Sequence, residues 1–209
     1  MSSAQLTMTE ETKKQLSSLL ANIIEIKSHL IKHCTLWCIK GPSLGASAGI
    51  TAIVQEEDGH VTILQRLRET EGLDKTQPTV TIPYLQELPR SWTHLILDIY
   101  IFDTFISRVI RTFKNSASIT FSENVQKMIE EEYFHEQFSR EWAALLAQSD
   151  NFKQEFSEEI MKALKSYDGL ADKFDTDVLV RESLISEDIG SVYRKFREEI
   201  AAEFSIVKE

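Results

Sequence analysis

Two stretches of the sequence place a glutamate and a histidine three residues apart. Glu57 and His60 lie in "EEDGH", and Glu132 and His135 lie in "EEEYFH". In an α-helix, residues three apart share one face, so each carboxylate would lie beside its imidazole. Carboxylate oxygen and imidazole nitrogen suit iron and manganese as ligands. One such pair is common on solvated helix faces and would indicate little, but the sequence has two.

The two pairs have matching surroundings. Apolar residues precede both pairs at the same spacing, and each matched position is 75 residues from its counterpart: Ile50, Ile53 and Val54 before the first pair, and Val125, Met128 and Ile129 before the second. Both series step by three and four, which places each glutamate near the centre of an apolar helix face. A buried carboxylate without a partner is costly, and bound cations would neutralise both. The pattern predicts the Glu-x-x-His half of a di-iron or di-manganese carboxylate bundle.

Such a bundle takes one further carboxylate from each of its other two helices. Asp103, which lies 29 residues before Glu132 among isoleucines, is the natural candidate on one helix. Asp98, 34 residues before Glu132, is the alternative and flanks the other side of that helix. We therefore expect Asp103 to be a terminal metal ligand. Glu57 and Glu132 are expected to bridge two ions, with one histidine on each ion.

The first helix departs from this plan. The equivalent position, 30 residues before Glu57, holds Lys27 in the middle of an apolar stripe. The nearest carboxylate, Glu25, points to nearly the opposite side. Three interpretations are open. Lys27 could replace one ion and leave a single metal. It could be a catalytic residue that accepts or donates protons beside that metal. It could also hold the carboxylates as an ion-pair network in a centre without metal.

Long helices must position these residues. The sequence has seven glycines and four prolines, and three of the prolines lie in the segment 72–90. We expect helices over the stretches between such breaks: residues 10–40, 43–71, 91–114, 122–148, 151–167, 176–185 and 187–207. The first four form two antiparallel helical hairpins joined by the long crossover 72–90. The sequence thus predicts one all-α domain, residues 1–209, with a ferritin-like four-helix bundle at 10–148 and a C-terminal helical extension at 151–207.

Composition and charge argue against several classes of function. The formal net charge of −10 disfavours binding to nucleic acid or to an anionic membrane surface, since both need a basic face. The apolar run at residues 94–110 is interrupted by Asp98 and Asp103, so it does not read as a membrane span. The N-terminus lacks the apolar core of a signal peptide. Cys34 and Cys38 lie one helical turn apart, a poor geometry for a disulfide, so we expect a cytoplasmic protein.

Around these residues the sequence resembles the catalytic subunit of the phenylacetyl-CoA epoxidase family, a group of ferritin-like di-iron oxygenases. The similar segments are "LWCIKGPSLGASAGITAIVQEEDGH", "FDTF" and "KMIEEEYFH", and they include Trp37 and the Gly-Pro turn at 41–42. The likeness covers roughly residues 20–145. Lys27 stands where the family has a carboxylate. The resemblance implies oxygen activation, an acyl-CoA-like substrate and metal ligation by five residues: Glu57, His60, Asp103, Glu132 and His135.

From the residues and the resemblance together we expect a metal-dependent oxidoreductase of the di-iron carboxylate type, acting on a small organic or acyl-CoA-like substrate. Iron is the expected metal, as two ions or as one if Lys27 occupies the second position, and manganese also suits the ligands. The alternative function is a non-catalytic partner subunit of the same fold. We expect a homodimer or a hetero-oligomer with a related subunit. His29 and His33, four residues apart, are interpreted as a surface pair.

Overall fold

The computed structural model of the protein describes residues 8–167 and 173–204. These residues form helices and loops and contain no β-strand. The helical elements follow the chain in this order: α1 (Glu10–Trp37), α2 (Leu44–Thr70), α3 (Pro83–Gln86), α4 (Trp92–Leu97), η1 (Asp98–Asp103), α5 (Thr104–Arg111), α6 (Ile119–Gln148), α7 (Lys153–Ser166), α8 (Asp177–Arg181) and α9 (Ile189–Glu203).

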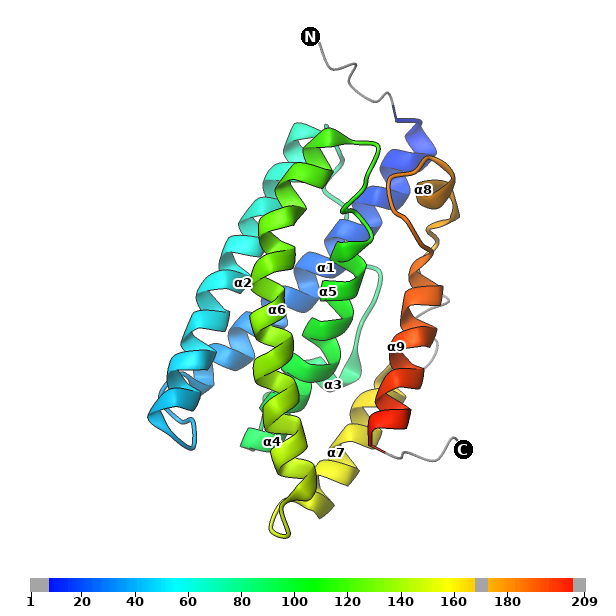
Figure 1. Ribbon diagram of the computed structural model, residues 1–209. Helices are drawn as coiled ribbons and strands as arrows, with labels where there is room; N and C mark the ends of the chain where they lie inside the picture. Colours follow the sequence, from blue (N-terminus) through cyan, green and yellow to red (C-terminus); the bar gives the residue numbers. More distant parts are fainter. Residues whose placement is uncertain (1–7, 168–172, 205–209) are drawn as a thin grey trace.

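Four long helical segments form the bundle (Figure 1). The first hairpin is α1 packed against α2. In the second hairpin, α6 packs against η1 and α5, which continue from α4. The two hairpins meet because α2 lies beside α6 and α1 contacts η1. The prediction of an all-α, ferritin-like bundle built from two hairpins is confirmed.

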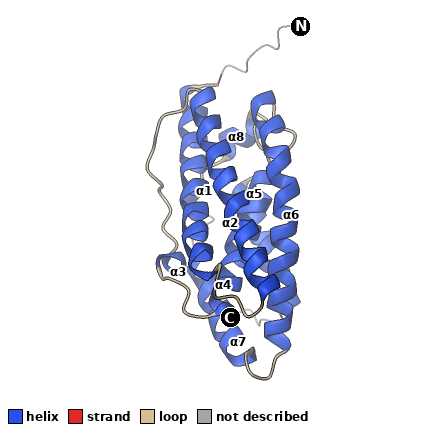
Figure 2. Cartoon of the chain, turned by 90° about the vertical axis from the view of Figure 1, so that its left-hand side faces the viewer, coloured by secondary structure: helices blue, strands red, loops and turns tan. Residues whose placement is uncertain are grey.

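A long crossover joins the two hairpins. It leaves α2 at one end of the bundle and runs back along α1 to α3 (Figure 2). Asn22 of α1 anchors it, because the side-chain Oδ1 accepts hydrogen bonds from the backbone N–H groups of Thr79 at 2.8 Å and Val80 at 3.0 Å. The crossover returns the chain to the end of the bundle where α4 begins, so the second hairpin can pack alongside the first.

Serine side chains set where three of the bundle helices begin. Ser43, Ser91 and Ser118 are the N-caps of α2, α4 and α6, and each accepts a hydrogen bond from a backbone N–H of the first helical turn. For α6 the donor is the N–H of Phe121, 3.4 Å from Ser118 Oγ. The expected start of this helix at residue 122 is therefore wrong, because Ser118 rather than Ser122 is the cap.

The third bundle helix is not one continuous α-helix, contrary to the prediction for residues 91–114. After α4 the chain enters η1, a π-helical segment from Asp98 to Asp103, and α5 follows it. A π-helical turn holds more residues than an α-helical turn, so it rotates the side chains that come after it around the helix axis. Every residue of η1 is buried, including the aspartates at its two ends.

The C-terminal helices complete the core on the side of α4 and α5 (Figure 1). α7 packs against α4, and α9 packs against α5. Tyr167, which follows α7, is fully buried, and its ring stacks on that of Phe102 in η1 with centroids 4.8 Å apart. Tyr193 of α9 meets Phe105 of α5 edge to face at 5.9 Å. The extension thus covers the helix that carries Asp103.

Other boundaries differ from the prediction near the C-terminus. α8 is shorter than the expected helix 176–185, because Ser183 adopts a φ of 56°, in the left-handed region where an α-helix cannot continue. α9 ends at Glu203, and the expected end at residue 207 lies outside the described residues. Among the helices described, none is long and apolar enough to span a bilayer.

Candidate metal centre

Six buried polar side chains meet inside the bundle. α1 supplies an amine, η1 supplies a carboxylate, and α2 and α6 each supply a carboxylate and an imidazole: Lys27, Asp103, Glu57, His60, Glu132 and His135. Each is at most 1% exposed. The structure therefore brings together the five residues predicted to bind metal, and it adds Lys27 to them.

Lys27 lies at the centre of the three carboxylates. Its Nζ donates hydrogen bonds to Oε1 and Oε2 of Glu57 at 2.7 and 2.8 Å, to Oε1 of Glu132 at 2.6 Å and to Oδ1 of Asp103 at 3.3 Å. Burial on its own would lower the pKa of the ammonium. The negative charges of the three carboxylates outweigh burial and raise the pKa of Lys27 well above its usual value. Lys27 is therefore a permanent cation within the cluster.

The two histidines turn the same ring nitrogen towards the carboxylates. Nδ1 of His60 lies 3.3 Å from Oε1 of Glu57 and 3.3 Å from Oε1 of Glu132. Nδ1 of His135 lies 3.0 Å from Oδ2 of Asp103. Burial would lower the pKa of each imidazole, but hydrogen bonds to carboxylates outweigh it. They raise the pKa of His60 to about 9, and they raise that of His135 well above its usual value.

The other ring nitrogen of each histidine points to an outer carboxylate on the opposite helix. Nε2 of His60 donates to Oε2 of Glu131 at 3.0 Å, and Nε2 of His135 donates to Oε2 of Glu56 at 2.8 Å. A metal-binding histidine usually donates its second N–H to a carboxylate in this way, which fixes the orientation of the ring. Glu56 and Glu131 are not among the residues expected from the sequence, although each directly precedes the glutamate of a Glu-x-x-His pair.

Four residues of the cluster have the arrangement of one metal site. Glu57, Asp103, Glu132 and His135 each offer one ligand atom, and these atoms lie within 4.8 Å of one another. Oε2 of Glu132 is buried without a hydrogen-bond partner in the described part of the chain, 3.6 Å from Nδ1 of His135. An unsatisfied buried carboxylate oxygen is costly, and a divalent ion would satisfy it. Three carboxylates and an imidazole suit iron or manganese.

Comparison with protein families gives a match over nearly the whole chain. The profile described as phenylacetic acid catabolic protein covers residues 1–207. The chain belongs to the phenylacetic acid catabolic protein family. The family is of the di-iron type, and its ferritin-like fold agrees with the bundle described above. A comparison with curated individual proteins gave no match.

In this chain, α1 brings no carboxylate to the centre. In a di-iron carboxylate bundle each helix contributes one. Glu25, the nearest carboxylate on α1, has a 46% exposed side chain and lies 3.4 Å from Nε2 of His29. Lys27 stands in the position facing the cluster instead. Four of the residues present could hold one ion, and the helix α1 brings an ammonium where the family pattern has a fourth carboxylate.

Asp98, the alternative ligand, lies outside the centre. It is fully buried, and its Oδ2 shares a hydrogen bond with Nδ1 of His33 at 2.8 Å. Burial raises the pKa of Asp98 to about 7. The interpretation of His29 and His33 as a surface pair is wrong for His33, which is buried because it pairs with this carboxyl group.

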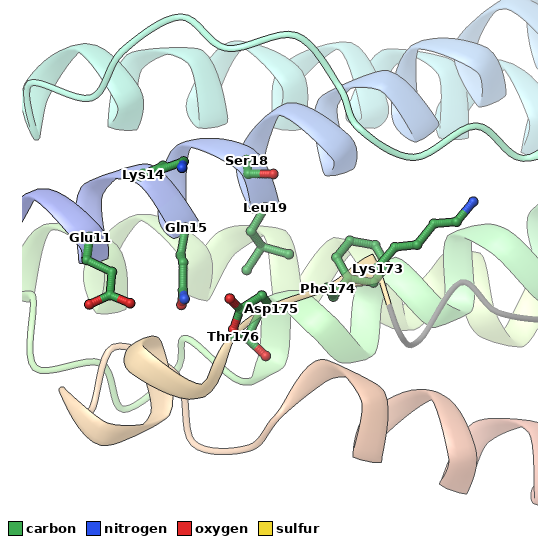
Figure 3. A pocket seen from close by; sticks show the side chains of 9 residues that line it. All are labelled: Glu11, Lys14, Gln15, Ser18, Leu19, Lys173, Phe174, Asp175 and Thr176. Atoms are coloured by element: carbon green, nitrogen blue, oxygen red, sulfur yellow. The ribbon is translucent and has the colours of Figure 1, made fainter.

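Two cavities in the described structure lie away from the centre. One of 220 Å³ is formed by the start of α1 and residues 173–176, with Lys14 and Phe174 among its lining residues (Figure 3). Another of 420 Å³ lies beside α3, α4 and α7 and is lined by residues that include Arg90 and His94. No side chain of the metal centre lines either cavity, so packed side chains separate the centre from both.

Proposed function

We propose that this chain is a metal-dependent oxidoreductase with a di-iron-monooxygenase-like role in phenylacetate catabolism, acting on a small organic or acyl-CoA-like substrate. One observation carries the proposal. Four ligand atoms, from Glu57, Asp103, Glu132 and His135, lie within 4.8 Å of one another, and Oε2 of Glu132 has no hydrogen-bond partner in the described residues. Family membership supports the class of reaction. We place the protein in the cytoplasm, where its free cysteines would stay reduced.

Iron or manganese would be held by these four residues. Such an ion, when bound, supplies the activation of dioxygen. Other features of the chain orient the ligands of this ion and shield them from water. Glu56 holds Nε2 of His135 and so directs Nδ1 towards the carboxylates. Burial of every ligand excludes water from the centre and strengthens each electrostatic contact there.

Lys27 would act as a fixed charge beside the metal. We considered a role in proton transfer, which needs a pKa near the working pH. The neighbouring carboxylates raise the pKa of Lys27 well above its usual value, so the proton stays on Nζ. Its charge outweighs burial and lowers the pKa values of Glu57 and Glu132, which keeps these two carboxylates ionised, and its bonds hold all three carboxylates in place. We therefore assign Lys27 a positioning role at the centre.

The test uses protein produced with iron and manganese supplied and purified without chelator. Metal content is measured first, and oxygen uptake is then followed with phenylacetyl-CoA and with free phenylacetate, with an added two-electron reductant because a monooxygenase reduces the second oxygen atom to water. We expect bound metal and substrate-dependent oxygen uptake, both lost in His135→Gln. His29→Gln is the matched control, because His29 lies on α1 outside the cluster. Folded protein that binds neither metal would refute the proposal.

A second candidate function is a non-catalytic partner subunit. The hydrogen bonds of Lys27 to all three carboxylates favour it, since an ammonium can neutralise buried carboxylates without metal. In that case the purified protein would contain no metal, and metal supply would leave its unfolding temperature unchanged. Metal content thus separates the two functions.

We also propose that the chain associates with a second copy or a related subunit. Large apolar side chains are exposed at the turn between α1 and α2, where Ile39 is 90% and Leu44 88% exposed. Tyr133 and Phe134 are exposed on α6. Apolar residues gathered on a surface are typical of interaction sites. Light scattering should give a dimer that dissociates in Ile39→Glu; a monomer at every concentration, with no related subunit bound, would argue against association.

A further inference from the structure

We propose that the Lys27 ammonium takes the place of one of the two ions, so that the centre binds a single divalent ion on the side of Asp103 and His135. This inference rests on the proposed function, because it requires that the centre bind metal. It goes beyond that function because it states how many ions bind, which side of the cluster the ion occupies and which residue excludes the second ion.

The two sides of the cluster are not equivalent. On the side of His60, every nearby carboxylate oxygen already has a cation: Nζ of Lys27 bonds both oxygens of Glu57 and Oε1 of Glu132 at 2.6–2.8 Å. Nδ1 of His60 faces these same groups, 3.3 Å from Oε1 of each glutamate. Oε1 of Glu57 also lies 3.3 Å from Nδ1 of His135, so it reaches both sides. An ion on this side would have to displace the ammonium, which is fully buried among these carboxylates.

The side of His135 has one carboxylate oxygen that no cation of the described residues bonds. Oε2 of Glu132 has no hydrogen-bond partner in the described residues, and it points to this side, 3.6 Å from Nδ1 of His135. Oδ2 of Asp103 lies 3.0 Å from the same nitrogen, while its Oδ1 is the oxygen that faces Lys27. Asp103 and Glu132 thus each give one oxygen to Lys27 and turn the other towards His135. Oδ2 of Asp103 accepts a hydrogen bond from Nδ1 of His135, and an ion that binds both atoms would replace that bond. His60 is outside the group of four ligand atoms that lie within 4.8 Å.

The charges lead to the same number of ions. In the family pattern, four carboxylates and two divalent ions form a neutral cluster. Exchanging one carboxylate for an ammonium raises the charge by two, which is the charge of one divalent ion. Metal binding requires neutral imidazoles. With both histidines neutral, Lys27 and the three carboxylates carry two negative charges, and one divalent ion neutralises them. A second ion would leave two positive charges buried without counter-ions, which is strongly unfavourable.

Paired histidine variants test this inference. His60 and His135 occupy matched positions on α2 and α6, so His60→Gln and His135→Gln are the same change on the two sides. We expect about one Mn²⁺ per chain in the parent protein at saturating Mn²⁺, about one in His60→Gln, and loss of the ion in His135→Gln. Equal losses in the two variants, or two ions in the parent, would overturn the inference and leave the proposed function standing. No bound ion in the parent would overturn both.

Lys27→Glu tests whether Lys27 is the residue that excludes the second ion. It restores a fourth carboxylate, so we expect about two Mn²⁺ per chain and the electron paramagnetic resonance spectrum of a magnetically coupled pair. The parent should give the spectrum of an isolated Mn²⁺. Circular dichroism of the Mn²⁺-loaded variant checks that it folds. If it does not fold, the comparison of His60→Gln with His135→Gln still tests how many ions bind and on which side. A folded Lys27→Glu protein that still binds one ion would show that Lys27 does not occupy the second place.

Discussion

Replacing Lys27 with methionine in metal-free protein tests whether the ammonium holds the centre together. Methionine keeps an unbranched apolar chain and removes the charge. The parent Nζ lies 2.6–3.3 Å from three carboxylates, and its loss leaves them facing one another in a buried site. Removing one partner of a buried charge network costs about 3–5 kcal/mol. For a chain of this size, 1 kcal/mol corresponds to about 2–4 °C in Tm, so we expect Tm to fall by roughly 6–20 °C.

The assay is thermal and urea unfolding followed by circular dichroism in the presence of chelator. Lys13→Met is the matched control, since Lys13 lies on the same helix and makes a surface ion pair at 3.6 Å with Glu10. Loss of that pair should cost less than about 1 kcal/mol. If Lys27→Met costs no more than the control, the ammonium does not hold the carboxylates. Mn²⁺ at 100 times its Kd should return about 2.7 kcal/mol of stability to the variant.

Three further predictions concern residues around the centre. Glu56→Gln removes the outer partner of His135 and should weaken Mn²⁺ binding by about 10–100-fold, measured by titration calorimetry, whereas Glu131→Gln should have a smaller effect; equal effects would contradict a one-ion centre. In chelator, the pKa of His60 is about 9 in the folded state against 6.5 unfolded, so its stabilisation is complete below pH 6.5 and is lost as the pH rises through 9. The free energy of unfolding should therefore fall over this pH range in the parent and fall less in His60→Gln. The same dependence on pH in both proteins would contradict the stabilisation of protonated His60. Burial raises the pKa of Asp98 from 3.8 to about 7, so the folded state retains that proton and stability falls as the pH rises from 4 to 7. Urea unfolding of Asp98→Asn should lack this decline, and an unchanged decline would be inconsistent with a buried, protonated Asp98.

Much of the centre could be predicted because two helices carry the same Glu-x-x-His pattern. Glu57 and Glu132 lie on apolar faces with the same three-and-four spacing, and long α-helices carry that spacing into space without distortion. The position of Asp103 could be found by counting back from Glu132 across one hairpin. Lys27 could be identified as the departure by the same count on the other hairpin. The all-α bundle followed from the same long helices and few breaks.

Other features depend on tertiary contacts that periodicity does not report. The π-helical segment η1 has no marker in the local sequence, and it shifts Asp98 and Asp103 relative to the positions they would have in a regular helix. His33 lies seven residues after Ile26 and three after Leu30, on the buried face of α1, and its partner there, Asp98, comes from another helix that the spacing does not indicate. The outer carboxylate Glu56 acts on a histidine of the opposite helix, so its role becomes visible only when α2 and α6 are packed.

The most direct test of the centre is X-ray diffraction from crystals of the parent protein grown with Mn²⁺, using the anomalous signal of manganese. We predict one anomalous peak per chain, among Glu57, Asp103, Glu132 and His135, with Nζ of Lys27 still bonded to Oε2 of Glu57 as in the structure described here. Two peaks per chain, or a single peak on the side of His60 with Lys27 displaced from the carboxylates, would contradict the assignment of Lys27 as the replacement for one ion.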